Sequence, residues 1–142
     1  EALPEVNRSY LSRWEALIWA LDGYIRTDLR EQRTPWHLQA EALLHENPPA
    51  ERPLSLDQIG QWQSRSVSDQ AKLMRQYMIA ESAVAYLVET YGREQIPDLL
   101  NGFAHHSNWS DLLFAVYGVN RGEVEDEWNS YIAQRFQWPT TN

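Results

Sequence analysis

Two histidines and a glutamate recur at four-residue steps on one predicted helix. His37, Glu41 and His45 therefore share roughly one helix face, and imidazole and carboxylate groups are good zinc ligands. The separation of His37 from His45, however, is about 12 Å along a helix, so these two side chains do not easily reach one ion. The chain contains no His-Glu-x-x-His segment. We therefore interpret the three side chains as a solvated polar face.

Two further histidines, His105 and His106, stand at the end of another predicted helix. A protonated imidazole there would interact favourably with the helix dipole, and histidine also titrates in the range that suits a general base. The sequence pairs neither of them with a nucleophile or an orienting acid. It also lacks a Gly-x-Ser-x-Gly elbow, a glycine-rich phosphate loop and any cysteine. A free-standing enzyme with a non-metal site at His37, His105 or His106 stays one of the alternatives.

The elements that carry these residues all have helical patterns. Apolar side chains recur at three- and four-residue steps, and no segment shows the strict alternation of a strand. We expect helices at residues 9–29, 35–46, 55–62, 69–91, 94–105, 112–117 and 121–136. The sequence therefore predicts an all-α fold, a compact irregular bundle of six to seven helices.

Capping residues mark most of the expected helix ends. The predicted N-caps are Thr34, Ser55 with Gln58 in a capping box, Ser66 or Ser68 with Asp69 in the first turn, Ser107 or Asn108, and Asn120. Gly92 is expected to end the longest helix in a left-handed conformation, and Gly118 to end the next but one. Gly23 lies inside the first helix, where a glycine indicates a break or a close contact.

The composition is that of one acidic domain covering residues 1–142. A hydrophobic fraction of 43% and a charged fraction of 23% support a real core and exclude a disordered tail. The net charge of −8 argues against nucleic acid or an anionic lipid as the main partner, and no apolar run is long enough to span a membrane. We expect a proline-rich internal loop at residues 47–54 and a frayed tail at residues 139–142.

A series of short motifs in residues 77–132 resembles bacterial peptidase-MA-like proteins, which belong to the gluzincin group of zinc metallopeptidases. The motifs are residues 77–82, Val84, Tyr86-Leu87 and Tyr91-Gly92, the pair Leu99-Leu100, residues 115–118, and residues 125–128. In the family they correspond to an apolar "Y-x-x-S…yLv-x-x-YG" helix, a leucine pair, an "A-x-x-x-x-G" turn and an acidic "E-x-x-W" helix. Each motif alone is weak, and their shared order and spacing make the resemblance more specific.

An upstream segment, residues 19–24, is similar to the family's "W-L-x-E-G-x-A-x-Y" segment. The Glu of that segment is the third zinc ligand, so the resemblance implies that role for Asp22, whose side chain is one methylene shorter. It also implies that Tyr77 or nearby polar groups face the substrate cleft. The family's His-Glu-x-x-His helix precedes this segment, and counting back from Asp22 falls at or before residue 1. A catalytic zinc takes three protein ligands and a water. This chain supplies at most one of those three protein ligands.

The leading hypothesis is the C-terminal helical subdomain of a gluzincin-like zinc peptidase, inactive alone because the His-Glu-x-x-His helix is absent. This chain then holds no cofactor by itself, and zinc binds only if an upstream segment completes the site. The alternative is a non-catalytic helical binding module with a peptidase-like frame, in which Trp36, Trp62 or Trp109 lines a groove. The partner is a peptide or protein in either case. The resemblance and the first residue, Glu1, favour an extracytoplasmic fragment of a longer protein.

Overall fold

The structure is a computed structural model that describes residues 14–30, 34–49, 54–62 and 69–138. These residues form seven α-helices and one 3-10 turn and contain no strand. The elements are α2 (Glu15–Arg30), α3 (Pro35–Glu46), α4 (Leu56–Gln61), α5 (Gln70–Tyr91), η2 (Arg93–Gln95), α6 (Ile96–His105), α7 (Trp109–Tyr117) and α8 (Arg121–Arg135). The predicted all-α bundle of six to seven helices is confirmed. Ser66, Ser68, the tail at 139–142, the expected helix start at 9–13 and part of the 47–54 loop lie outside the described residues.

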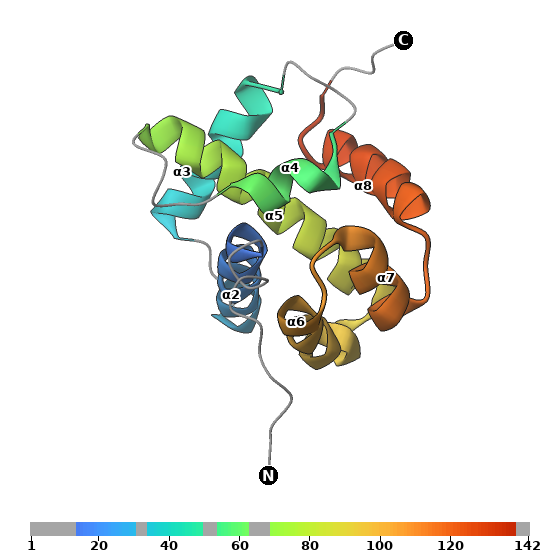
Figure 1. Cartoon of the computed structure of the whole chain (residues 1–142). Helices are drawn as coiled ribbons and strands as arrows, with labels where there is room; N and C mark the ends of the chain where they lie inside the picture. The colour runs from blue at the N-terminus through green and yellow to red at the C-terminus, as the bar shows by residue number, and fades with distance from the viewer. Residues whose placement is uncertain (1–13, 31–33, 50–53, 63–68, 139–142) are drawn as a thin grey trace.

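The longest helix, α5, is the centre around which the others pack. Helices α2, α3, α4 and α8 all contact it, and Figure 1 shows it running through the middle of the molecule, with α2 and α3 on the left and α7 and α8 on the right. Its residues from Tyr77 to Val88 are buried without interruption. A helix that is buried on every face must be covered from all sides, so α5 cannot be stable without these neighbours.

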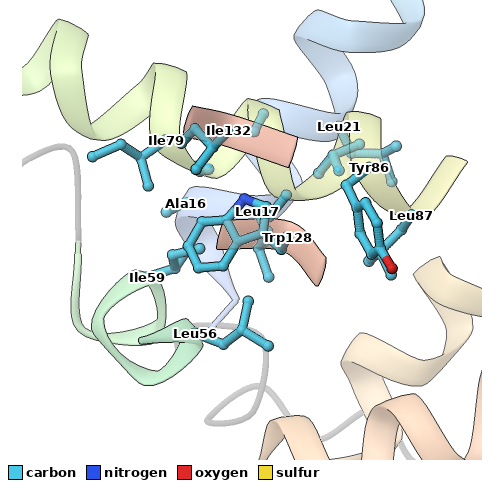
Figure 2. Close-up of a cluster of buried hydrophobic side chains, with 14 of the residues drawn as sticks. Ala16, Leu17, Leu21, Leu56, Ile59, Ile79, Tyr86, Leu87, Trp128 and Ile132 are labelled. Carbon is cyan, nitrogen blue, oxygen red and sulfur yellow. The ribbon is translucent and has the colours of Figure 1, made fainter. Parts of the chain in front are cut away.

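The core on one side of α5 is built around the indole of Trp128 from α8. Figure 2 shows this indole in the middle of a cluster that includes Leu17 of α2 and Leu56 and Ile59 of α4. Its Nε1–H donates to the Oγ of Ser82 at 3.0 Å, and the Ser82 hydroxyl donates to a backbone carbonyl of α5 at 2.6 Å. Both buried polar groups are therefore satisfied within the core.

Two side chains of α8 hold the start of α4 by its backbone. The Asn129 side chain accepts from the Leu54 N–H at 2.6 Å and donates to the Leu54 carbonyl at 2.9 Å. Glu125 accepts from the Leu56 N–H at 2.7 Å, which is one of the orphan donors of the α4 N-terminus. The segment leading into α4 is thereby fixed on α8.

No helix in the described part of the chain is long and apolar enough to cross a membrane.

Most of the predicted caps are confirmed. The Thr34 side chain accepts from the His37 N–H, the Ser55–Gln58 capping box is present, and Asn108 and Asn120 cap α7 and α8. Helix α7 begins at Trp109, three residues before its first predicted apolar residue.

Two helix ends differ from the prediction. Asp69 is itself the N-cap of α5, because its carboxylate accepts from the Ala71 and Lys72 N–H groups. Gly92 has φ 100° and ψ 155°, which is a positive φ outside the left-handed helical region, and the chain passes directly into the η2 turn. Gly118, with φ 68° and ψ 28°, is the left-handed end.

Candidate functional site

Residues of the two family-like segments and of α3 meet around the ring of Tyr77. Trp19 and Gly23 come from α2, Trp36 and His37 from α3, and Tyr77 from α5. The rings of Trp19, Trp36 and His37 lie 4.7, 5.0 and 5.4 Å from the ring of Tyr77, each centroid to centroid. Tilted and edge-on contacts at such distances are favourable for aromatic pairs. The cluster therefore ties α2 and α3 to the central helix.

The hydroxyl of Tyr77 is held by a histidine from the first turn of α3. It lies 2.9 Å from the Nε2 of His37, and the Nδ1 of the same ring lies 2.7 Å from the Oγ1 of Thr34. Thr34 is also the N-cap of α3, and its Oγ1 accepts the His37 backbone N–H at 3.1 Å. Both ring nitrogens of His37 are thus engaged within the protein, so in this arrangement the ring has no nitrogen left for a metal.

Gly23 makes room for the Tyr77 hydroxyl on the face of α2. A Cβ at Gly23 would lie 1.9 Å from the hydroxyl oxygen and 3.0 Å from the ring carbon that carries it. Gly23 is inside a regular helix, so it is needed for close approach and not for an unusual backbone angle. The close contact predicted at this glycine is confirmed, and it places the backbone beside Asp22 against Tyr77.

Replacing Gly23 by alanine should lower the free energy of unfolding by about 1–3 kcal/mol, since the rigid Tyr77 ring is enclosed and cannot move aside cheaply. Alanine is more favourable than glycine inside a helix by about 1 kcal/mol, and this gain offsets part of the steric cost. Chemical denaturation followed by circular dichroism measures the change. The matched control is the same substitution in a Tyr77→Phe background, where the clashing oxygen is gone and the penalty should be smaller. An equal penalty in both backgrounds would show that the contact does not cause it.

Asp22 and Tyr77 differ sharply in accessibility. The Asp22 side chain is 56% exposed and forms an ion pair with the Nε of Arg26 at 3.2 Å, whereas Tyr77 is only 2% exposed. Burial raises the pKa of Tyr77 well above its ordinary value, and the negative charges of Glu81 and Asp22 raise it further. The phenol therefore stays protonated at neutral pH, and its hydroxyl faces α2 and α3 and not the solvent.

The interpretation of residues 37, 41 and 45 as a solvated polar face is wrong for most of that face. His37 is half-buried against Tyr77, and Glu41 is half-buried with its Oε1 3.7 Å from the Nη2 of Arg135. His45 is exposed, yet its Nδ1 lies 2.5 Å from the backbone carbonyl of Phe136. The cause is that α5 packs on α3 and the C-terminal end of α8 reaches it, which local spacing does not reveal.

The remaining histidines have roles at a helix end. The Nδ1 of His105 lies 2.8 Å from the Asn101 carbonyl one turn earlier in α6, and the His106 backbone carbonyl accepts from the indole of Trp14.

Of the tryptophans considered for a groove, Trp36 and Trp62 are half-buried and Trp109 is buried.

The ligands for a zinc ion are not assembled by the residues that the structure describes. No group of three or more histidine, aspartate or glutamate side chains there is arranged to hold a metal. Asp22 is paired with Arg26, and all four histidines of the chain lie within the described residues without forming a ligand set with it. A catalytic zinc with three protein ligands therefore does not fit the described residues alone.

Comparison with known protein families identifies the family to which the chain belongs. A family model described as the Peptidase MA superfamily matches residues 52–134, which is more than half of the chain. The chain therefore belongs to the Peptidase MA superfamily. The matched residues contain α4 to α7 and nearly all of α8, and they include Tyr77. No curated protein and no solved structure matches the chain.

The pairing of His37 with Tyr77 has no signal in the sequence. The two residues are 40 positions apart and lie on helices whose own patterns say nothing about which faces meet. The glycine inside the first helix was the one local sign of a close contact, and a tyrosine was not identifiable as its partner.

Proposed function

We propose that this chain is the C-terminal helical subdomain of a gluzincin-like zinc peptidase, and that it does not hydrolyse peptides on its own. The observation that carries the proposal is the contact between Gly23 and Tyr77. It joins the segment similar to the family's third-ligand segment to the first residue of the motif series in the matched region. Two segments that resemble one family at separate places in the chain thus meet in space.

In this proposal Asp22 is the third zinc ligand of a site whose other ligands come from a His-Glu-x-x-His segment outside these 142 residues. The Asp22 carboxylate lies on the exposed side of α2, where its pairing with Arg26 is an exposed ion pair of little strength. Tyr77 is buried, so its part is to hold α2, and with it Asp22, against α3 and α5. The subdomain then closes one side of a cleft for a peptide substrate.

The test compares the 142-residue chain with a longer chain that includes an upstream His-Glu-x-x-His segment, if the coding sequence provides one. After dialysis the short chain should retain only substoichiometric zinc and should not cleave peptides, whereas the longer chain should do both. In the longer chain Asp22→Ala should lose zinc, and Asp22→Glu should keep it because the carboxylate is preserved. Zinc-dependent cleavage by the 142-residue chain would contradict the proposal.

A second candidate is a non-catalytic binding module that keeps the peptidase-like frame. It is supported by the lack of a three-ligand group among the described residues and by the large exposed side chain of Phe114 on α7, which is 73% exposed. A start codon or signal peptide directly before Glu1 in the coding sequence would favour this module.

A further inference from the structure

A surface pocket of about 530 Å³ lies where one face of α3 meets the end of α8. Its walls are formed by Leu38, Glu41, Ala42, His45, Arg135, Phe136 and Gln137. Its volume is within the range of pockets that bind small molecules. The pocket combines an apolar wall with one carboxylate and one guanidinium, and these three features determine what it can bind. The imidazole of His45 also lines it, with its Nδ1 at the backbone carbonyl of Phe136.

The guanidinium of Arg135, in the pocket wall, is held in place by a carboxylate of α5. The Nη1 of Arg135 donates to the Oε1 of Glu81 at 2.7 Å, and the Glu81 side chain is almost fully buried in α5. This pair offsets part of the cost of burying the guanidinium, which also forms a side-chain hydrogen bond with Tyr131, and these contacts set its orientation. Arg135 therefore presents its other nitrogen, Nη2, from a preset position at the pocket wall.

The acidic group lies next to it. The Oε1 of Glu41 is 3.7 Å from the Nη2 of Arg135, a distance at which the two charges attract but do not form a direct hydrogen bond. The pocket thus displays a positive and a negative group side by side. A ligand that carries both charges on neighbouring atoms matches this display, because its carboxylate can bind the guanidinium while its ammonium binds the carboxylate.

The apolar wall gives the ligand's side chain a place. Leu38 is 55% exposed, Ala42 is exposed one turn further along α3, and Phe136 closes the other side. Phe136 is fixed because its carbonyl is bound by His45, while the indole of Trp138 donates to the Leu44 carbonyl at 3.1 Å. An apolar side chain of the ligand would cover the exposed leucine and alanine.

We propose that this pocket binds a free α-amino acid with an apolar side chain, with its carboxylate on Arg135, its ammonium on Glu41 and its side chain against Leu38 and Ala42. In a free α-amino acid the ammonium and carboxylate groups are bonded to the same carbon. In a peptide the terminal ammonium and carboxylate groups are separated by at least one peptide bond. This inference does not rest on the proposed peptidase function.

The first test titrates the folded 142-residue chain with leucine, with 4-methylpentanoate, which lacks the ammonium, and with 3-methylbutylamine, which lacks the carboxylate. Leucine should bind about tenfold or more tightly than either analogue, because each analogue loses one charge-assisted hydrogen bond. Leucylglycine, whose charges are further apart, should also bind more weakly. In NMR spectra the leucine-induced shifts should be largest at Leu38, His45 and Gln137. Equal affinities for all four compounds, or no binding of leucine, would overturn the proposal.

The second test locates the ammonium contact. Glu41→Gln should reduce leucine affinity by about tenfold and remove its advantage over 4-methylpentanoate. The matched control is Glu46→Gln, the same substitution on the same helix at an exposed residue outside the pocket wall, and it should leave leucine affinity unchanged. Circular dichroism checks that both variants keep their helix content. Leucine binding that is insensitive to Glu41→Gln, or equally sensitive to both substitutions, would place the site elsewhere.

Discussion

Replacing Trp128 by alanine should lower the free energy of unfolding by about 3–5 kcal/mol, the range expected when a large buried aromatic side chain is truncated. Trp128 is 1% exposed and contributes to the core that joins α8 to α2, α4 and α5. The substitution leaves a cavity at the meeting point of four helices, where no single helix can move in to fill it without leaving its other contacts. Since domains of this size are stable by about 5–15 kcal/mol, much of the total stability would be lost.

Urea denaturation followed by both far-ultraviolet circular dichroism and tryptophan fluorescence measures this loss. Trp128→Phe is the informative control, because it keeps an aromatic ring in the core and removes the hydrogen bond to Ser82 with only part of the indole volume. It should be less destabilising than the alanine variant. If alanine and phenylalanine cost the same, the loss comes from the hydrogen bond and the packing argument is wrong.

The second large effect is expected at Glu81, whose removal leaves the Arg135 guanidinium half-buried without its closest anion. Breaking such a pair by removing one partner costs about 3–5 kcal/mol, and the Glu41 carboxylate near Nη2 should keep Glu81→Ala toward the lower end of this range. The same denaturation experiment measures it.

The double variant Glu81→Leu with Arg135→Met separates the two contributions. It removes both charges and replaces them by apolar side chains of similar length, a change that is often neutral or stabilising for a buried pair. It should therefore be clearly more stable than Glu81→Ala. A double variant as unstable as the single one would indicate that the hydrogen-bond geometry, and not the uncompensated charge, makes this site sensitive.

The helices were predictable from the sequence because their signals are local. Thr34, Ser55, Asn108 and Asn120 each cap the helix that follows within a few residues, so their function is visible in a short stretch of sequence. The shift of the α5 cap to Asp69 is an error of the same local kind, since aspartate suits both the N-cap and the first turn.

The assembly of the helices was not predictable, because it depends on pairs of side chains far apart in the chain. His37 meets Tyr77, Glu81 meets Arg135, and Glu41 reaches the same arginine. Each of these residues looks like an ordinary polar position on its own helix. The spacing of residues 37, 41 and 45 suggested one solvated face, whereas α5 and the C-terminal end of α8 give the three side chains three different partners.

The hydrogen bonds from α8 to the segment before α4 determine which residues that segment can contain. The Asn129 side chain, which also donates to the Glu125 carbonyl within α8, contacts residue 54 through its main-chain atoms. This contact would therefore accept any residue at position 54 except proline, which has no N–H. The burial of the Leu54 and Leu56 side chains instead fixes the register, since a slip by one position would turn them outward. Main-chain bonds provide strength and alternate side chains provide selectivity, which is how proteins recognise extended peptides from other molecules. Helix α8 thus holds part of its own chain as though it were a bound ligand.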